Sequence, residues 1–258
     1  MTPSPIRRVL SILRAHDVRF LLMGGQACVF YGAAEFSRDT DIVLLAELAN
    51  LQRLRRALAA LHAECIAVPQ LSLKWLRKGH AVHFRCHHPE VENMRLDVMA
   101  VLRNAPPFNG LWKRRTTITL TDNESYDLIS LPDLVQVKKT QRDKDWFMLG
   151  RLVEAHYFNC CNKPSARMIA FWLKEMRAET LLISLTRRYP KQTAAIMRKR
   201  PLLIFALRGD EAGLARALKQ EEEVERRADR LYWAPLKKYL ERLRHYIQQT
   251  KKPSRDEK

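Results

Sequence analysis

The feature that most constrains the fold is a short apolar run that ends in two consecutive glycines. Residues 18–23 are mostly apolar and strand-like, and Gly24 and Gly25 follow them directly. Residues 26–34 then carry apolar side chains at helical spacing. In a strand that turns at glycines into a helix, backbone N–H groups and the helix N-terminus can hold phosphates. We therefore expect a strand, a glycine turn and a helix at this point of the chain.

Strand-like and helix-like segments alternate through the first half, whereas the second half is almost all helical in pattern. The other expected strands are residues 41–45, 81–86, 94–101 and 115–120. The expected helices outside the glycine segment are residues 48–61, 130–145, 166–187, 209–232 and 234–249. We expect an α+β fold with two domains. Residues 1–130 form a mixed sheet with flanking helices, and residues 131–258 form a mostly helical, basic domain that ends in a polar tail.

The charge of the chain points to its partners. Lys and Arg total 46 against 28 acids, which gives a net charge of +18 and a pI near 10.0. Residues 160–258 alone carry a net +12. Net charge does not determine a fold, but it favours binding of polyphosphates, nucleic acid or an anionic membrane surface. Any single Lys or Arg is explained by a solvated surface. The net charge of residues 160–258 as a whole favours a polyanionic partner.

The spacing of the five cysteines does not match a known pattern of disulfides or of zinc ligands. Cys160 and Cys161 are adjacent, which suits neither a structural disulfide nor a standard zinc site. His83 and Cys86 would point to opposite faces of a strand, so a metal site there is disfavoured.

The sequence contains no stretch typical of a transmembrane helix or a signal peptide, and we expect no membrane partner. The longest apolar runs are far shorter than the roughly 20 residues of a transmembrane helix. The first residues lead into an amphipathic segment instead of the apolar core of a signal peptide. We expect a cytoplasmic protein.

Three acidic residues form the strongest candidate site. Asp39 and Asp41 flank Thr40 at the start of a buried strand, and alternation along the strand places both carboxylates on one face. Asp97 lies within another strand, where acids are depleted. Side-by-side carboxylates repel each other unless a cation lies between them, and such oxygen ligands suit Mg²⁺. The alternative for Asp39 is a turn or helix cap.

The glycine turn and the acids together resemble the nucleotidyltransferase superfamily, which has the DNA polymerase β-like fold. Residues 22–27 (Leu-Met-Gly-Gly-Gln-Ala) and the run Arg38-Asp39-Thr40-Asp41 carry the resemblance, with Asp97 as the third carboxylate. Residues 131–145 make the chain most similar to the bacterial AbiEii/AbiGii toxin group, which includes the MenT tRNA-modifying toxins. The resemblance covers about residues 15–155. The chain departs from many of these toxins in having Thr40 between the two acids, which leaves the metal-binding pair open, although only Asp39 and Asp41 are available.

The resemblance implies roles for the residues that match. Asp39, Asp41 and Asp97 would hold two Mg²⁺ ions, and Asp97 could alternatively act as the base. Gly24 and Gly25 would let the backbone approach the triphosphate, with Arg38 beside them.

A second group lies in the segment after residue 130. The pattern predicts one helix capped by Ser130 that places Lys138 and Asp145 on the same face. The resemblance implies that this segment closes the nucleotide site, with Lys138 or Lys139 and Arg142 reaching the phosphates. The alternatives are a solvated face for the lysines and a surface ion pair for Arg142 and Asp145.

The resemblance favours a Mg²⁺-dependent nucleotidyltransferase that moves a nucleotide from an NTP to an RNA, such as a tRNA 3′ end, in a toxin–antitoxin system with a cognate antitoxin. One alternative is the same chemistry on a small-molecule or protein hydroxyl. The other is a catalytically silent nucleic-acid-binding protein of the same fold.

Overall fold

The computed structural model describes residues 5–120 and 124–250, which divide into two compact units. The sheet unit takes in the described chain up to Ala27, Phe36–Ser130 and the chain from Leu231 onward. The helical unit takes in Cys28–Glu35 and Leu131–Arg230. The division after Ser130 coincides with the predicted boundary, whereas residues 28–35 and 231–250 are grouped differently from the prediction. The predicted polar tail at 251–258 lies outside the described residues.

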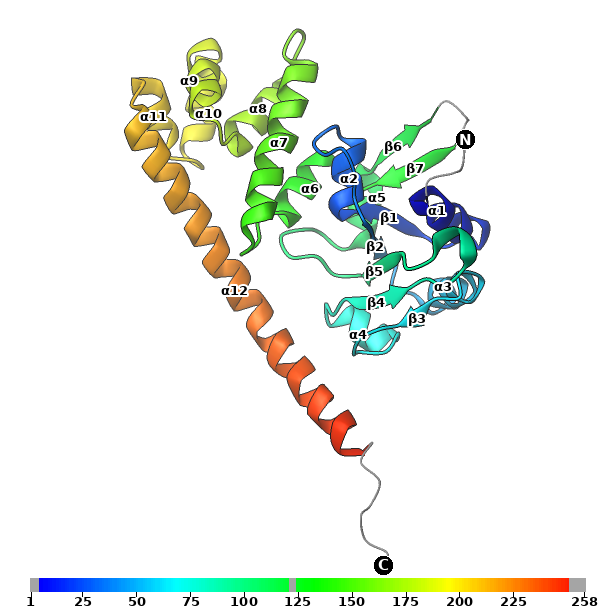
Figure 1. The fold of residues 1–258 in the computed structure, drawn as a ribbon. Helices are drawn as coiled ribbons and strands as arrows, with labels where there is room; N and C mark the ends of the chain where they lie inside the picture. Colours follow the sequence, from blue (N-terminus) through cyan, green and yellow to red (C-terminus); the bar gives the residue numbers. More distant parts are fainter. Residues whose placement is uncertain (1–4, 121–123, 251–258) are drawn as a thin grey trace, which may run out of the picture. The chain divides into compact units, whose positions relative to one another are not determined.

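The sheet unit is built on a seven-stranded mixed sheet, which confirms the α+β class (Figure 1). The strand order is β3-β4-β5-β2-β1-β7-β6. The strands are β1 (Phe20–Met23), β2 (Asp39–Leu44), β3 (Glu64–Cys65), β4 (Val82–Arg85), β5 (Arg95–Met99), β6 (Thr116–Thr119) and β7 (Ser125–Leu128). At the centre, β2 runs antiparallel to β1 and parallel to β5. β3 and β7 were not predicted, and the predicted strand at 41–45 begins two residues earlier, so the aspartates lie inside it.

Alternation along β2 and β5 separates a buried face from a polar one. Thr40 and Ile42 are fully buried and pair in register with Leu96 and Val98, which are also fully buried. Because neighbouring residues in a strand point to opposite faces, the residues between them all point to the other face. The apolar residues therefore form the core and leave the acids on the opposite side.

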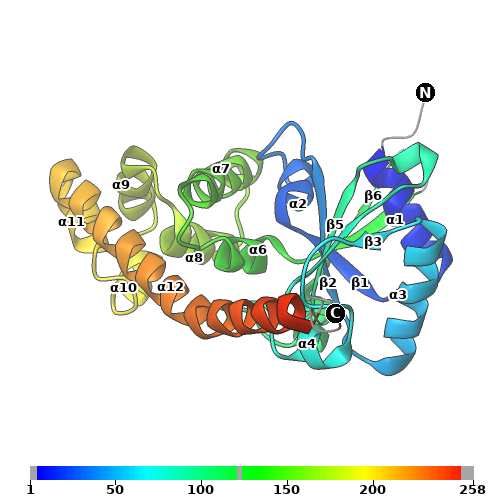
Figure 2. The same ribbon diagram turned by 60° about the horizontal axis from the view of Figure 1, so that its bottom comes forward.

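Helices cover the sheet and contribute to the core of this unit (Figures 1 and 2). They are α1 (Pro5–Ala15), the first turn of α2 (Gly24–Phe30), α3 (Leu48–Ala60), α4 (Leu73–Arg77), the 3₁₀ helix η1 (Pro89–Val91) and α5 (Phe108–Arg114). α3 confirms the helix predicted at 48–61. Its leucines Leu51, Leu54 and Leu58 are buried, as the spacing predicts for an amphipathic helix. The helix expected at 26–34 is shorter and begins at Gly24.

The helical unit contains α6 (Leu131–Val137), α7 (Asp143–Cys160), α8 (Ala166–Glu175), α9 (Glu179–Arg188), α10 (Pro190–Met197), α11 (Leu203–Arg208) and the first half of α12 (Glu211–Thr250). The single helix predicted at 166–187 is two helices. Arg177 lies in the break, where its guanidinium donates to the carbonyl of Leu218. Such a tertiary contact leaves no trace in local periodicity.

α12 is one continuous helix where the sequence predicted two. It passes through Pro235, which removes one helical N–H donor without ending the helix. Asp210 caps its start, since Asp210 Oδ1 accepts from the backbone N–H of Gly213 at 2.8 Å. Among the described residues, no helix combines the length and apolar character needed to cross a membrane.

Candidate functional site

The glycine turn lies directly against one of the predicted acids. β1 ends at Met23, which pairs in register with Asp41, and Gly24 opens α2 with a φ of +67°. A Cβ atom on Gly24 would lie 1.9 Å from Asp41 Oδ2. The backbone N–H of Gly25 donates to the same oxygen over 3.4 Å. Glycine at position 24 is therefore required both by the left-handed backbone and by the space that the carboxylate takes.

The three predicted carboxylates share one face of the sheet. Asp39 and Asp41 lie two residues apart on β2, and the parallel register of β2 with β5 places Asp97 beside Asp41. All three residues are partly buried. Because Thr40 points into the core on the other face, the acids are strand residues, and the alternative of a turn or helix cap at Asp39 does not apply.

Asp97 is held by two neighbours that the sequence analysis did not assign to the site. His83 Nδ1 lies 2.8 Å from Asp97 Oδ1, and Arg95 Nε donates to the same oxygen at 2.8 Å. Burial raises the pKa of Asp97, but the bonds from His83 and Arg95 outweigh it and leave that pKa below its ordinary value. Asp97 is thus kept ionised, which suits a metal ligand better than a general base.

The pairing of β4 with β5 explains why these neighbours were missed. His83 is the register partner of Asp97 across the antiparallel β4–β5 pair, and a sequence does not reveal which strands pair. Arg95 could have been found from the alternation of β5, because it lies two residues from Asp97 on the same face. Cys86 is fully buried, whereas His83 is partly exposed on the face that carries Asp97.

The three acids offer carboxylate oxygens from neighbouring positions on one face of the sheet. Asp39 and Asp41 offer carboxylate oxygens on one face, and both bonds to Asp97 go to Oδ1, so Oδ2 remains for a further contact. Mg²⁺ prefers carboxylate oxygens of this kind, and His83 and Arg95 orient Asp97 as outer partners orient metal ligands elsewhere. Within residues 5–120 and 124–250, no three His, Cys, Asp or Glu side chains form a group that is already arranged to hold a metal ion.

A substitution at Gly24 tests the close approach of the turn. Gly24→Ala is expected to abolish any activity that depends on Asp41, because the new methyl group would displace the carboxylate. Gly32→Ala is the matched control, since Gly32 also has a positive φ (+74°) but nothing lies within 4 Å of its Cβ position. Both variants should lose about 1–2 kcal/mol of stability from the left-handed backbone. Urea unfolding and an activity assay on both proteins separate the two effects, and equal activity in both would contradict this assignment.

The second predicted group lies in the helical unit, where the structure corrects its setting. α6 ends at Val137 and α7 begins at Asp143, so Lys138, Lys139 and Arg142 occupy a turn and not a continuous helix. Within the turn, the carbonyl of Thr140 accepts from Trp146 Nε1 at 2.6 Å.

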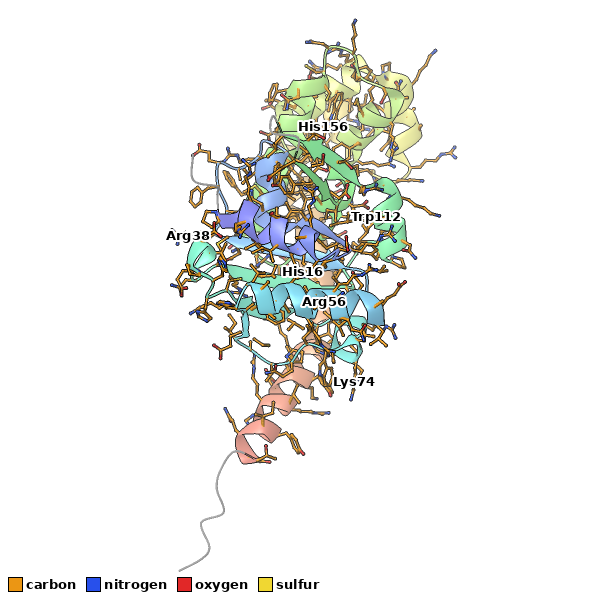
Figure 3. All side chains as sticks on the ribbon, turned by 90° about the vertical axis from the view of Figure 1, so that its right-hand side faces the viewer. His16, Arg38, Arg56, Lys74, Trp112 and His156 are labelled. Atoms are coloured by element: carbon orange, nitrogen blue, oxygen red, sulfur yellow. The ribbon has the colours of Figure 1, made fainter. Side chains whose placement is uncertain are left out.

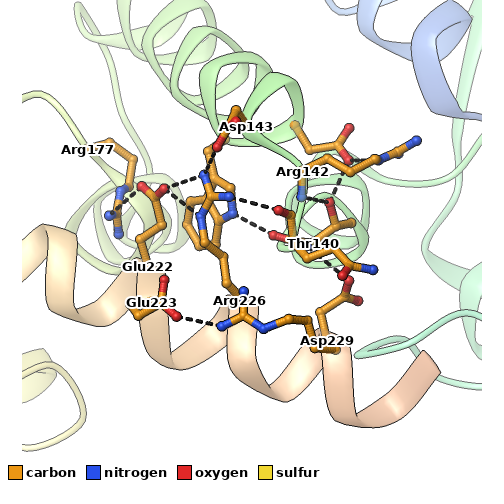
Figure 4. Close-up of polar contacts among 12 residues, drawn as sticks. Thr140, Arg142, Asp143, Arg177, Glu222, Glu223, Arg226 and Asp229 are labelled. Atoms are coloured by element: carbon orange, nitrogen blue, oxygen red, sulfur yellow. Dashed lines mark hydrogen bonds and ion pairs between the residues drawn. The ribbon is translucent and has the colours of Figure 1, made fainter. Parts of the chain in front are cut away.

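Asp145 accepts hydrogen bonds from three side chains of this turn, two of which, Thr140 and Arg142, are labelled in Figure 4. It is 2% exposed and accepts from Lys138 Nζ at 3.1 Å, from Thr140 Oγ1 at 2.6 Å and from Arg142 Nε at 2.6 Å. The contact between Lys138 and Asp145 is therefore real, although the turn makes it and not helical spacing. The burial of Asp145 also rules out a mere surface ion pair with Arg142. Burial raises the pKa of Asp145, but the charge of Lys138, the bond from Thr140 and Arg142 together hold it below its ordinary value of 3.8.

Two predicted residues do not contact Asp145: Lys139, although it lies in the same turn, and Arg38. Lys139 turns toward Glu175 and pairs with Glu175 Oε2 at 2.8 Å. Both line a cavity of about 370 Å³ within the helical unit. With side chains only 13% and 17% exposed, Lys138 and Lys139 do not form a solvated face. Arg38, in the sheet unit, is exposed (Figure 3).

The depressed pKa of Asp145 predicts how the helical unit responds to acid. A carboxylate whose pKa is lower in the folded than in the unfolded protein stabilises the fold at pH values above the unfolded-state pKa. This stability is lost as the pH falls through the folded-state pKa. Asp145→Asn should therefore cost about 3 kcal/mol at pH 7, because Lys138 is left unpaired in a buried setting. The deficit relative to the parent should shrink below about pH 4. Urea unfolding at pH 7 and pH 3 measures this, with the exposed neighbour Asp143→Asn as control. A deficit that stays constant with pH would count against the role of Asp145.

The two groups of residues belong to different units: the acids and the glycine turn to the sheet unit, and the cations with the buried Asp145 to the helical unit. Comparison of the chain with protein-family models and with curated proteins gave no match.

Proposed function

We propose that the protein is a Mg²⁺-dependent nucleotidyltransferase with a DNA polymerase β-like catalytic unit, which transfers a nucleotide from an NTP to an acceptor hydroxyl. One observation carries the proposal. Asp41 lies against the Gly24–Gly25 turn and in register with Asp97, so the acids and the turn meet on one face of the sheet. This is the juxtaposition that the resemblance implies.

In nucleotidyl transfer, each of these residues would have a distinct role. A hydroxyl attacks the α-phosphate, pyrophosphate leaves, and negative charge develops on the attacking and leaving oxygens. Bound Mg²⁺ would stabilise that charge as a Lewis acid. Asp39 and Asp41 would hold the cation, and the ionised Asp97 would complete the oxygen set. The N–H groups of the glycine turn would approach the phosphates, as at other glycine-rich turns.

Cations of the helical unit would bind phosphate groups. Lys138 and Arg142 share the single charge of Asp145, so this cluster keeps a net positive charge. Positioned cations bind phosphate oxygens through charge-assisted hydrogen bonds. Asp145 would act by orienting these two side chains.

We propose an RNA, such as a tRNA 3′ end, as the acceptor. The net charge of +12 over residues 160–258 is the kind of electrostatic footprint that nucleic-acid-binding proteins show. Binding that depends on such contacts weakens steeply as salt concentration rises, because counterions are released from the phosphates. A small-molecule acceptor would not need this charge.

Incubation with each α-labelled NTP, Mg²⁺ and total tRNA tests the proposal. The expected result is transfer of label to RNA by the parent protein and none by Asp41→Asn. Label that reaches small molecules or protein would replace the RNA acceptor by a hydroxyl of another class. Salt-sensitive RNA binding without any transfer would overturn the enzymatic proposal and support a silent nucleic-acid-binding protein.

A further inference from the structure

The charge of α12 changes sign at its middle. Residues 211–230, its first half, carry six acids and five Lys or Arg side chains, a net charge of −1. Residues 231–250, its second half, carry one acid and four Lys or Arg side chains, a net charge of +3. The change coincides with the division between the units, because the chain from Leu231 onward belongs to the sheet unit. The basic end of α12 is therefore a feature of the sheet unit.

The two halves of α12 also differ in how their cations are paired. In the first half, Arg226 pairs with Glu222 at 2.7 Å and Arg230 pairs with Glu223 at 2.5 Å. In the second half, no Lys or Arg side chain has an ion-pair partner within residues 5–120 and 124–250, and all four are exposed. These four are Lys237, Lys238, Arg242 and Arg244. Their charge is therefore available to a partner.

α4 contacts this end of α12 through aromatic rings. The ring centroids of Trp75 and Tyr239 are 5.2 Å apart, and those of His80 and Tyr239 are 5.6 Å apart. Lys78 caps the C-terminal end of α4, and its Nζ lies 5.4 Å from the centroid of Trp75 and 5.1 Å from that of Tyr239. An ammonium group over aromatic rings is attracted to them but keeps its charge. Lys78 thus brings a positive charge of α4 beside α12 (Figure 2).

The cations at this contact form two pairs of like charge. Lys74 and Lys78 lie four residues apart at α4, and Lys238 and Arg242 lie four residues apart on α12, on either side of Tyr239 in the sequence. Side chains four residues apart on a helix are neighbours, and like charges at that spacing destabilise it. All four are exposed, and Lys74 is labelled in Figure 3. We call these four side chains the basic face; the fold gains nothing from their repulsion, so a binding role explains them better.

We propose that the basic face binds the phosphate backbone of the acceptor RNA. The proposal rests on the proposed function, because it takes the acceptor to be RNA. A chain of phosphates, unlike a single small anion, can contact cations on two helices at once. Each phosphate contact by Lys or Arg releases a counterion from the nucleic acid and needs no particular base. The basic face would therefore position the RNA without selecting its sequence.

The aromatic rings at the contact favour a nucleic acid over a membrane surface. Helices that bind membranes insert apolar side chains among the lipids. Trp75 and Tyr239 are only partly exposed, because they pack on each other and on Lys78. Tyr246 lies one turn beyond Arg242 and is 65% exposed. An exposed ring beside cations can stack on a base of single-stranded RNA.

The experiment measures binding of fluorescently labelled total tRNA by anisotropy, without NTP, from about 50 to 300 mM KCl. The Lys78→Gln/Lys238→Gln variant should bind roughly tenfold more weakly than the parent at about 100 mM KCl. A plot of log affinity against log salt concentration should be less steep by about one to two, because two phosphate contacts are lost. Lys78→Arg/Lys238→Arg should bind like the parent, since it keeps both charges.

The chain offers a matched control for the loss of charge. Lys163 and Lys191 are exposed lysines of the helical unit, and Lys163→Gln/Lys191→Gln should bind tRNA like the parent. An equal loss of affinity in this control, or parental affinity in Lys78→Gln/Lys238→Gln, would overturn the proposal. Thermal unfolding checks that each variant is folded. If Lys78→Gln/Lys238→Gln is not, Lys74→Gln/Arg242→Gln makes the same test, because it removes the other member of each pair.

Two competitors test the class of the partner. Vesicles with phosphatidylserine and duplex DNA should each displace labelled tRNA less well than unlabelled tRNA at equal phosphate concentration. If either competitor binds the parent more tightly than tRNA does, and loses that binding in Lys78→Gln/Lys238→Gln, the basic face serves a membrane or DNA and the RNA assignment is wrong.

Because the binding assay contains no NTP, the two proposals can fail separately. RNA binding that depends on the basic face, without any label transfer, would overturn the proposed function and leave this surface assigned. Label transfer to RNA with parental affinity in Lys78→Gln/Lys238→Gln would overturn the role of the basic face alone.

Discussion

Replacing Asp41 by asparagine is expected to lower the rate of the proposed nucleotidyl transfer by about a thousandfold or more. Asn keeps the shape of the side chain beneath Gly24 but removes the charge that would hold Mg²⁺. Loss of metal-assisted charge stabilisation costs several kcal/mol of the activation barrier, and about 4 kcal/mol corresponds to a thousandfold in rate. The measurement is kcat/KM for label transfer from the preferred NTP.

The control makes the same Asp-to-Asn substitution at a position away from the glycine turn. Asp127 lies on β7 of the same sheet and pairs with Arg115 Nε at 3.0 Å. Asp127→Asn should transfer label at close to the parental rate. Thermal unfolding should show that the Asp41→Asn protein is folded. If the Asp41→Asn variant is folded and has parental activity, the assignment of the carboxylates to catalysis is wrong.

Replacing Arg200 by alanine is expected to destabilise the helical unit by about 3–5 kcal/mol, since it breaks a buried ionic network. Arg200 is 4% exposed and donates to both oxygens of Glu221, at 3.0 and 2.8 Å. It also donates to the carbonyls of Leu173 and Met176, at 3.0 and 3.1 Å. Burial raises the pKa of Glu221, but the contacts with Arg200 and the charges of Arg177 and Lys139 hold it below its ordinary value. Alanine would leave two carbonyls and part of a carboxylate buried without these donors.

Urea unfolding of three variants checks this expectation. Arg198→Ala, two residues earlier on the exposed surface, should change the free energy of unfolding by less than about 0.5 kcal/mol. Arg200→Lys should recover only part of the loss, because an ammonium cannot bond both carboxylate oxygens and two carbonyls in one plane. An Arg200→Ala protein as stable as Arg198→Ala would show that the network contributes nothing.

The parts of the candidate site that local pattern determines were predictable. An apolar run that ends in Gly24 and Gly25 is sufficient to predict the strand and the turn. Alternation places Asp39 and Asp41 on one face whichever strands lie beside them. Asp97 could be placed on a strand, but its register beside Asp41 depends on the parallel pairing of β2 with β5. That pairing is a tertiary property.

The parts that depend on contacts between distant segments were not predictable. Helical periodicity continues through residues 138–142, so one helix was expected there. The observed turn depends on Asp229 of α12, whose Oδ2 accepts from the backbone N–H of Gln141 at 3.0 Å. It also depends on Arg226 of α12, whose Nη1 donates to the carbonyl of Gln141 at 2.8 Å. β3, with two residues, is too short for any pattern to reveal.

The connection between α6 and α7 has a consequence for the affinity of whatever it binds. The carbonyl of Thr140 and both the N–H and the carbonyl of Gln141 form hydrogen bonds. Lys138 pairs with the buried Asp145. A segment that is already ordered loses little conformational entropy when a ligand arrives. An anion that contacts Lys138 therefore meets a preorganised charge. Loosening the segment through Asp229→Ala should weaken that affinity even though Asp229 lies on another helix.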